Sequence, residues 1–338
     1  MYDELLDKNK YIKRVFSVVV PHYNQHNLWK TTIDSIISQT YPSIQIVFSD
    51  DGTKDFNTSV VEQYIKKNGS GNIHSAVVLT RAENIGTVKN LNISHQHCVG
   101  YYITHIAADD AYANKDVLMN YAISLDEIDE SICGIYGRAL KCNKDLKYFD
   151  EDFIDINIAD KYNLLSPHQQ FKKMLQKCYI PMGACAFLMN RFKSYMPFNE
   201  DYFLIEDWPF FLKVTKAGKR FKFCDFSALL YREGGVTSGG NAKAYEDHLK
   251  LYDNEIWPYS RLLSYGELFK MTYKYDYDRH FMKKVTGPIM SEKRIKFLKK
   301  DIRIAGVLLD KLLKEREFGE GVKEIYHNLA LYLYNPYL

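Results

Sequence analysis

The sequence of 338 residues lacks the patterns that mark several large classes of protein. No apolar run approaches the ~20 residues that a membrane-spanning helix needs. The formal net charge is only +3, which gives little electrostatic support for nucleic-acid binding, so we expect no nucleic-acid partner. Repeats and low-complexity segments are also absent. What remains is an ordinary globular composition, with 46% hydrophobic and 26% charged residues.

Disulfide and zinc patterns are missing too. The six cysteines show no C-x-x-C spacing, and the ten histidines include no H-E-x-x-H pattern. Several of the cysteines sit in apolar stretches, which is typical of reduced thiols. Residues 1–14 are charged and contain no apolar stretch, which argues against a signal peptide. We therefore expect a cytoplasmic protein, either free or held peripherally at the inner face of the membrane.

Two common nucleotide-binding motifs are absent. The first predicted strand-to-helix turn lacks G-x-G-x-x-G, and no G-x-x-x-x-G-K-[ST] stands near a strand end. The sequence therefore gives no motif support for a dinucleotide-binding enzyme or for a P-loop kinase.

Strand and helix patterns alternate through the first third of the chain. The strands are predicted at 16–20, 44–49, 73–80 and 101–106, and the helices at 27–39, 55–67 and 87–97. Pro21 is expected to stop the first strand. Alternation at this spacing predicts right-handed crossovers and a mainly parallel central sheet, Rossmann-like, with helices on both faces.

The pattern loosens beyond Asp110. Further helices are predicted at 115–125, after Pro167 and at 207–217, and further strands at 133–140, 184–190 and 221–231, whereas the acidic segment 148–163 is expected to be irregular. Glycine pairs between 234 and 240 indicate a boundary. We predict a catalytic domain over 1–238, with halves at about 14–112 and 113–238, and a mostly helical C-terminal region over 239–338.

Polar side chains follow three of the predicted strands. They lie in the segments PHYN (21–24), DDGT (50–53) and ADD (108–110). Ligands of an open α/β sheet bind outside the carboxyl ends of its strands. A single Asp there could be only a turn former or a helix cap, but two adjacent pairs favour a site. Clustered carboxylates suit Mg²⁺ or Mn²⁺ completed by substrate phosphates.

The ordered set of these segments resembles family 2 glycosyltransferases with the GT-A fold. The resemblance rests on SVVVPHYN (17–24), IDSIISQTYP (33–42), IVFSDDGT (46–53), ENIG (83–86), Asn92 and the pair Asp109-Asp110. Order and spacing agree without a gap between Gly86 and Asp110. Each piece alone is weak, whereas the ordered set is specific.

The resemblance implies a site for a nucleotide-sugar donor. Tyr23 would pack near the base, Asp51 would bond the uracil edge with Asp50 beside it, and Asp109 and Asp110 would hold the ribose and a divalent metal, Mn²⁺ or Mg²⁺. The donor-binding residues are then Pro21, Tyr23, Asn24, Asp50, Asp51, Arg81, Asn84, Gly86 and Asp109. The chain departs from the family at Ala107, where Asp is frequent, and at Leu91, where Arg is frequent. Lys89 or Arg81 could supply the missing charge.

The second half carries a match of its own. The segment YFLIEDWPFFLKV (202–214) resembles the family's Glu-Asp segment, which opens a helix under the acceptor site. Asp207 matches the general base, and Glu206 precedes it. Asp207 could also be simply a helix cap, and Trp208 either lines the acceptor site or is a buried structural residue.

The resulting hypothesis is an inverting, metal-dependent transferase of a hexose or N-acetylhexosamine. The donor would be a UDP-sugar, and the acceptor a glycan, a glycoprotein or a lipid-linked molecule. The alternative is an inactive module that binds a sugar nucleotide or glycan. In the C-terminal region, a basic set around 293–300 is either a solvated face or a contact with an anionic membrane, and residues 325–338 could pack on the catalytic domain or form a homo-oligomer.

Overall fold

The computed structural model describes residues 11, 13–26, 28–234, 241–264, 267, 268 and 271. The chain divides into two compact units, Met1–Asn241 and Ala242–Leu338. The predicted boundary between 238 and 239 lies outside the described residues, as do the predicted basic helix face and the Tyr- and Leu-rich ending.

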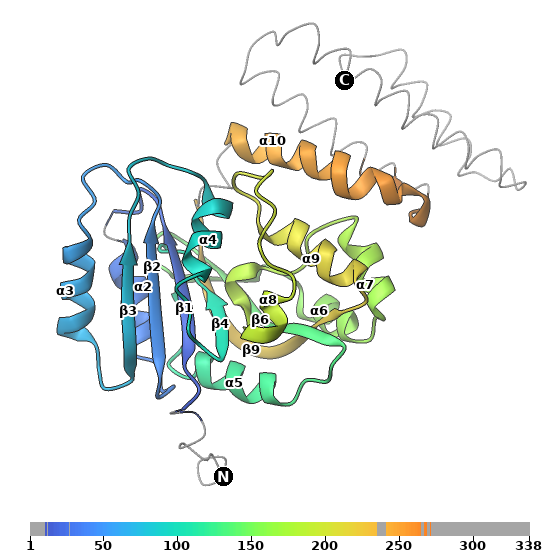
Figure 1. Cartoon of the computed structure of the whole chain (residues 1–338). Coiled ribbons are helices and arrows are strands. Elements are labelled where there is room, and N and C mark those ends of the chain that lie inside the picture. Colours follow the sequence, from blue (N-terminus) through green and yellow to red (C-terminus); the bar gives the residue numbers. More distant parts are fainter. Residues whose placement is uncertain are drawn as a thin grey trace, which may run out of the picture. The chain divides into compact units, whose positions relative to one another are not determined.

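The first unit is built on a mixed β-sheet surrounded by helices (Figure 1). Its strands are β1 (Phe16–His22), β2 (Ile44–Asp50), β3 (Ile73–Leu79), β4 (Tyr102–His105), β5 (Ala111–Tyr112), β6 (Ile132–Cys142), β7 (Tyr148–Asp152), β8 (Cys185–Leu188) and β9 (Arg220–Arg232). Its helices are α2 (Leu28–Ile37), α3 (Thr58–Asn68), α4 (Thr87–His95), α5 (Val117–Asp126), α6 (Ile156–Asn163), α7 (Pro167–Met174), η1 (Met182–Ala184), α8 (Met189–Lys193) and α9 (Asp207–Lys216).

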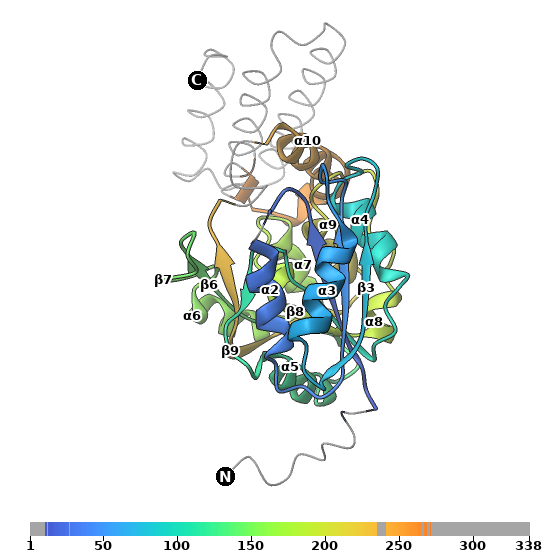
Figure 2. The same cartoon turned by 90° about the vertical axis from the view of Figure 1, so that its left-hand side faces the viewer.

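The strand order within the described residues is β3-β2-β1-β4-β8-β6-β9-β5, with β7 paired to β6. Strands β1 to β4 pair in parallel, and so do β6 and β9, whereas β8 runs antiparallel to both β4 and β6. Helices α2 and α3 cover one face of the parallel part, and α4 lies on the other (Figure 2). The predicted α/β fold with a mainly parallel central sheet is confirmed.

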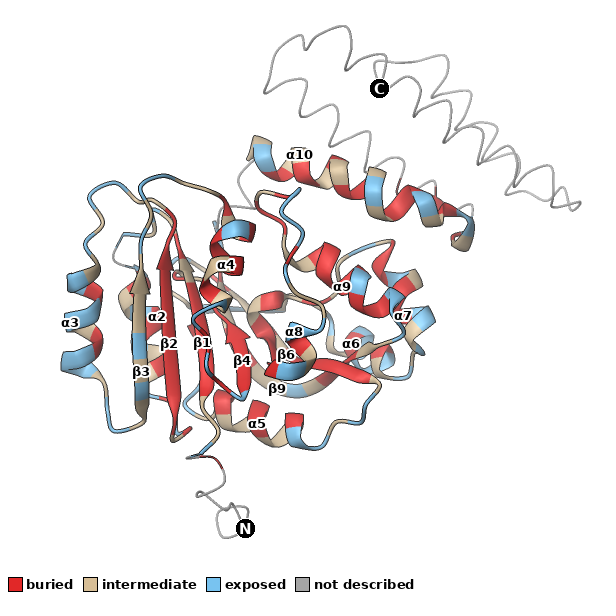
Figure 3. Cartoon of the chain, in the orientation of Figure 1, coloured by how far each residue is buried: buried red, intermediate tan, exposed pale blue. Residues whose placement is uncertain are grey.

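The core lies along the central strands. Every residue of β2 is buried, and so are all residues of β1 except Pro21 (Figure 3). Strands covered on both faces are mostly apolar, as residues 16–20 and 44–48 are, and the two polar exceptions, Ser17 and Gln45, are hydrogen-bonded to each other over 2.6 Å. These strands form a rigid support for the polar residues at their ends.

The prediction that Pro21 stops the first strand is wrong. Strand β1 continues through Pro21, because its pairing with β2 extends to His22 opposite Asp50. The N and O atoms of one residue in a parallel strand point to the same neighbour, and the Pro21 carbonyl accepts from Ala108 on the β4 side, beyond the last β1–β4 pair. The missing N–H of proline therefore costs no ladder hydrogen bond.

The expectation of irregular structure over 148–163 is also wrong. The segment forms strand β7 and helix α6, and the Asp155 side chain caps the helix by accepting the N–H groups of Asn157 and Ile158. The acidic residues here serve as a cap and as polar positions on a strand at the edge of the sheet. Other predicted elements agree with the structure apart from shifts of a few residues at their ends.

The second unit begins with helix α10 (Ala242–Leu251) and continues into the π-helix η2 (Tyr252–Ile256) and the 3₁₀-helix η3 (Trp257–Leu262). Within the described part of the chain, no helix combines the length and apolar character needed to cross a membrane.

Candidate active site

The carboxyl ends of β1, β2 and β4 meet at one edge of the sheet. The N–H of Asp51 donates to the His22 carbonyl over 2.8 Å, and the N–H of Ala108 donates to the Pro21 carbonyl over 3.1 Å. The structure thus joins the three polar segments that the sequence places after these strands.

Asp51 holds the loop that precedes α4. Its two carboxylate oxygens accept the N–H groups of Ile85 (3.0 Å) and Gly86 (2.9 Å). Burial raises the pKa of Asp51, although these two N–H groups and the nearby Arg81 oppose the rise. Each carboxylate oxygen has a second lone pair, so Asp51 retains capacity to accept a bond from a ligand.

Gly86 connects the two halves of the first unit. Its φ of 93° lies in the left-handed region, and an added Cβ would stand 2.6 Å from the carbonyl oxygen of Phe203. The N–H of Val88 donates to the same carbonyl over 3.3 Å. The loop held by Asp51 therefore packs directly on the segment that leads into Glu206 and Asp207, and only glycine fits there.

The structure does not support direct contact between Asp50 and a donor. Asp50 is 0% exposed, and its carboxylate bonds His22, the Thr53 N–H and the Thr80 hydroxyl. Although burial opposes ionisation, these hydrogen bonds hold the pKa of Asp50 below its usual value. The sequence pattern could not show that the first Asp of the pair points inward and only the second faces the loop.

The loop after β1 brings Tyr23, Asn24 and Gln25 to the edge. Tyr23 is half-buried, and Asn24 is exposed with a φ of 57° that is held by a 2.8 Å bond from its N–H to the Thr53 hydroxyl. Gln25 accepts the Tyr23 N–H through its side-chain oxygen and donates to Asp109 over 3.1 Å. Sequence reasoning missed Gln25, since nothing in its spacing distinguishes it from an ordinary loop residue.

Arg81 is the basic residue beside Asp51. Its guanidinium donates to the Ser49 hydroxyl over 3.2 Å, and its Nε is buried without a hydrogen-bond partner among the described residues. Lys89 is exposed, whereas Leu91 is buried at 1% exposure. The side chain of Asn84 accepts the Gly86 N–H over 3.1 Å, so Asn84 shapes the same loop as Asp51.

Asp109 and Asp110 lie between β4 and β5, against the end of β9. Asp109 is half-buried, and Asp110 is only 5% exposed, with one oxygen accepting the Arg232 N–H over 2.8 Å. The Arg232 guanidinium donates to the carbonyl oxygens of Asp109 and Lys144. Burial raises the pKa of both carboxyls, and the charge of Asp109 adds to the larger rise at Asp110.

Asp109 and Asp110 suit a divalent metal whose remaining ligands come from the substrate. The described residues contain no group of three or more His, Cys, Asp and Glu side chains that could hold an ion by themselves. Asp109 is partly exposed, and one of its carboxylate oxygens accepts a bond from the Gln25 side chain. Mg²⁺ and Mn²⁺ accept one or two protein carboxylates when substrate phosphates complete the shell. Asp109 is therefore the better candidate ligand, because Asp110 is more deeply buried.

Glu206 and Asp207 stand at the start of α9. Asp207 accepts the Trp208 N–H over 2.6 Å, and the Cys178 thiol lies 3.9 Å from its other oxygen. Burial raises the pKa of Asp207, and burial together with the Asp207 charge raises the pKa of Glu206 to about 8. With this pKa, Glu206 is neutral at pH 7, which leaves Asp207 as the candidate base of the pair. Sequence reasoning missed Cys178, which has no motif.

Trp208 does not line an acceptor site. It is 4% exposed, and its indole N–H donates to the Met174 carbonyl of α7 over 2.6 Å. This is the structural alternative that the sequence left open. The sequence pattern of α9 cannot distinguish a structural Trp208 from one that lines the acceptor site, because its hydrogen-bond partner, Met174, belongs to α7.

Two histidines near the site are structural. His95 and His105 approach with their Nε2 atoms 2.7 Å apart, among Phe192 and Phe198. Burial lowers the pKa of His95 and lowers that of His105 to about 3, so both rings are neutral.

Within the described part of the chain, no hydrogen bond joins Asp207 to Asp109 or Asp110. The donor-side carboxylates and the start of α9 are connected through Gly86 and Phe203. Roles for individual residues in binding or catalysis remain predictions.

Comparison with known proteins gives consistent results. The uncharacterized glycosyltransferase EpsJ of Bacillus subtilis (strain 168) is 26% identical over 250 residues, which cover 71% of this chain and 68% of the relative. S. aureus TarS (residues 1–349) in complex with UDP-GlcNAc has a TM-score of 0.54 at 16% identity, covering 82% of this chain and 77% of that one.

The mannosyltransferase PcManGT from Pyrobaculum calidifontis, in complex with GDP-Man and Mn²⁺, has a TM-score of 0.51 at 16% identity, covering 98% of this chain and 87% of that one. At these identities the two structures indicate a shared fold. The model of the family described as "Glycosyl transferase family 2" matches residues 17–195, more than half of the chain. The chain therefore belongs to glycosyl transferase family 2 and is a glycosyltransferase.

Proposed function

We propose that this glycosyltransferase moves a hexose or N-acetylhexosamine from a UDP-sugar to a glycan, glycoprotein or lipid-linked acceptor by a single inverting displacement. The observation that carries the proposal is the placement of two partly buried carboxylate pairs. Asp109 and Asp110 lie at the strand ends, Glu206 and Asp207 lie at the start of α9, and all four have raised pKa values. Related folds in complex with UDP-GlcNAc and GDP-Man support a nucleotide-sugar donor.

At the donor end, Tyr23 packs on the base and Asp51 accepts its N–H edge, with Arg81, Asn84 and Gly86 completing the loop. Asp109 holds a divalent metal, Mn²⁺ or Mg²⁺. When bound, such an ion offsets the charge that develops on a leaving diphosphate. The Mn²⁺ in the mannosyltransferase complex supports this part of the proposal.

At the acceptor end, Asp207 takes the proton of the attacking hydroxyl. The acceptor oxygen then forms a bond to the anomeric carbon as the bond from that carbon to the diphosphate breaks, and the nucleoside diphosphate leaves. A base on the side opposite the leaving group gives inversion in one step. Glu206, neutral at pH 7, is able to donate a hydrogen bond to the acceptor or to Asp207.

Six free cysteines in the described residues support a reducing compartment, the cytoplasm, as the place of this reaction.

The test is a panel of UDP-, GDP- and dTDP-sugars with Mn²⁺, followed by thermal shift and by release of nucleoside diphosphate. We expect a UDP-sugar to give both the largest stabilisation and the fastest release. Preference for a GDP-sugar would replace the UDP assignment while leaving the carboxylate roles intact. Anomeric analysis of the product by NMR would contradict the single displacement if the donor configuration were retained.

A further inference from the structure

His22 and Asp50 form a buried pair directly beneath the donor end of the site. The Nδ1 of His22 lies 2.8 Å from an oxygen of Asp50, and their side chains are 1% and 0% exposed. His22 closes β1 and Asp50 closes β2, where they stand opposite each other in the sheet. Because an ionised carboxylate only accepts hydrogen bonds, Nδ1 carries the proton that joins them.

The pair is enclosed by the side chains and backbone around it. The His22 ring packs against both Phe48 and Phe56, with centroid distances of 5.3 and 5.2 Å. The other Asp50 oxygen accepts the Thr53 N–H over 3.1 Å and the Thr80 hydroxyl over 2.9 Å. Four segments, the ends of β1, β2 and β3 and the turn after β2, therefore converge on one carboxylate.

The next residue on each strand is a predicted base contact. Tyr23 follows His22, and Asp51 follows Asp50, with the Asp51 N–H bonded to the His22 carbonyl over 2.8 Å. Thr53, which donates to Asp50, also accepts the N–H of Asn24 over 2.8 Å. Any change in the spacing of His22 and Asp50 must move Tyr23 and Asp51 relative to each other.

We propose that His22 is a positioning residue which, through Asp50, presets the distance between Tyr23 and Asp51 and so prepares the site for the nucleotide base. The inference rests on the proposed function, because it takes Tyr23 and Asp51 as the base contacts. His22 is buried, and the proposed effect runs through the strand ends that it joins.

The chemistry of burial explains why the pair has this effect. A buried carboxylate is tolerated only when hydrogen bonds replace its lost hydration. Removing the Nδ1–H leaves one oxygen unsatisfied, and the strand ends must separate to admit water, or Asp50 must take up a proton and release Thr53 or Thr80. Either response loosens the base site before a donor arrives, and binding must then restore the order.

Two variants separate the hydrogen bond from the ring. His22→Phe keeps a ring packed against Phe48 and Phe56 and loses the donor. His22→Asn loses the ring and keeps a donor, because the Asn amide nitrogen takes the place of Nδ1. His74→Phe is the matched control, since His74 is exposed on β3 and lies outside the proposed site.

The full chain would be titrated with UDP and with GDP by calorimetry, without acceptor, and amide hydrogen exchange would follow residues 23–25 and 51–53. We expect His22→Phe to weaken binding of the preferred nucleoside diphosphate about tenfold to a hundredfold. We expect His22→Asn to stay within about threefold of wild type, and His74→Phe to bind as wild type does. Exchange should accelerate in both loops of His22→Phe only.

Unchanged affinity in folded His22→Phe would overturn the inference. An equal loss in the Phe and Asn variants would also overturn it, because a retained hydrogen-bond donor would then fail to preserve binding. If His22→Phe does not fold, Thr80→Val removes another donor to Asp50 and should weaken binding severalfold; unchanged binding there again contradicts the inference. A wild-type chain that binds neither UDP nor GDP would instead end the proposed function, and this inference with it.

Discussion

Acidic residues in two regions of the first unit differ in burial and in the direction of their pKa shifts. Asp109 and Asp110 after β4, and Glu206 and Asp207 at the start of α9, are removed from water in part, and their pKa values are raised. At the other end of the sheet, where β6 and β9 begin, Asp129 is exposed, and hydrogen bonds from Ser131, followed by the Arg220 charge, hold its pKa below the usual value.

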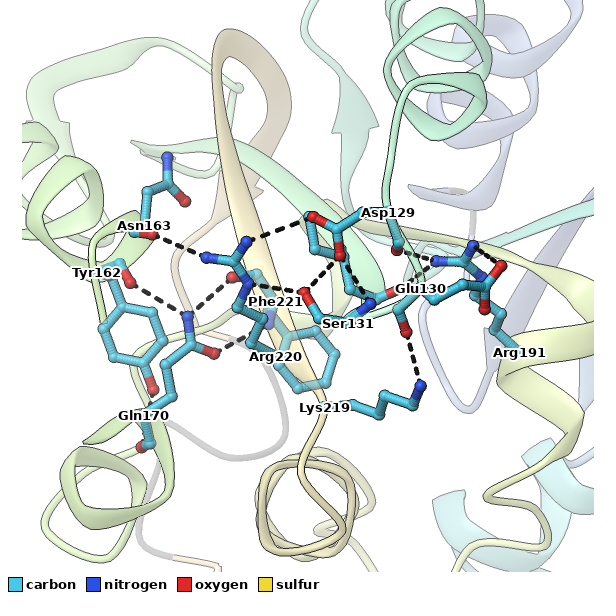
Figure 4. Close-up of polar contacts among 11 residues, drawn as sticks. Asp129, Glu130, Ser131, Tyr162, Asn163, Gln170, Arg191, Lys219, Arg220 and Phe221 are labelled. Carbon is cyan, nitrogen blue, oxygen red and sulfur yellow. Dashed lines mark hydrogen bonds and ion pairs between the residues drawn. The ribbon is translucent and has the colours of Figure 1, made fainter. Parts of the chain in front are cut away.

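The amino end of β6 and β9 is a satisfied network (Figure 4). Arg220 donates to the Ser131 hydroxyl over 3.1 Å and to the Asn163 carbonyl over 3.2 Å. Arg191 donates to two carbonyls of the α5–β6 connection, and Lys219 donates to a third over 2.6 Å. Each cation here closes a loop, which is a structural role.

The difference indicates where a ligand is needed. Acids that are paired within the chain stabilise it and need nothing further, whereas acids buried beside one another raise the free energy of the unliganded fold. Binding of a metal, a phosphate-bound cation or a proton lowers this free energy. We therefore expect a ligand at the two raised-pKa carboxyl pairs and none at the amino end of β6 and β9.

The largest contrast is expected from removing the proposed base. Asp207→Asn should lower turnover by about 10²- to 10⁴-fold, because the acceptor hydroxyl loses its proton acceptor. Binding of the nucleoside diphosphate should be unchanged. Released diphosphate and calorimetry measure the two effects, with Asp129→Asn as the matched control at the other end. Full turnover in Asp207→Asn, or an equal loss in the control, would break the comparison.

The next effect concerns the metal. Asp109→Asn should lower turnover by about 10²- to 10³-fold, since less charge on the leaving diphosphate is offset. In the wild type, EDTA should stop turnover, and added Mn²⁺ or Mg²⁺ should restore it. Activity that persists in excess EDTA would exclude a metal role for Asp109.

A smaller effect concerns stability. Its dependence on pH should have opposite signs for Glu206 and for Asp129. With a pKa of about 8 against an ordinary value of 4.5, Glu206 holds its proton more tightly in the folded state. Stability contributed by this proton is present at low pH and is lost as pH rises from about 4.5 towards 8. Glu206→Gln should remove that loss in thermal melts taken across this range.

Asp129 should behave in the opposite way. Its folded pKa is lowered, so its contribution is present above its unfolded pKa and is lost as pH falls through the folded value. In a plot of melting temperature against pH, Asp129→Asn should reduce only the fall seen at acid pH. If both Glu206→Gln and Asp129→Asn changed the melting temperature in the same pH range, the expected difference between the two groups would be contradicted.

The smallest effect is expected at Arg191. Arg191→Gln removes bonds to the Asp129 and Ile132 carbonyls and should cost about 1 kcal/mol of stability, a fall of about 2–4 °C in melting temperature. Turnover at 25 °C should be unchanged. A loss of turnover without loss of stability would mean that the amino end serves the reaction as well.

The donor half was predictable because its signals are local. Continuous apolar runs gave β1, β2 and β4, and the ordered motif segments identified the family. The acidic run before Asn163 was misleading, since composition does not show that Asp155 is a cap or that β7 is an edge strand.

What the sequence could not supply were contacts between distant segments. Arg232 reaches Asp109, Trp208 reaches Met174, and Gln25 reaches Asp109 only after the chain has folded. Asp50 and Asp51 are neighbours of the same type, and only the direction of each side chain gives one to His22 and the other to Gly86.

Gly86 carries one further consequence. Its amide is fixed by the Asp51 carboxylate while its α-carbon rests against the Phe203 carbonyl, so there is no spare volume between the two halves of the first unit at this point. A single methyl group there would have to displace either the base-recognition loop or the polypeptide that carries the proposed proton acceptor. A substitution at Gly86 should therefore disturb the loop held by Asp51 and the segment leading to Asp207 together.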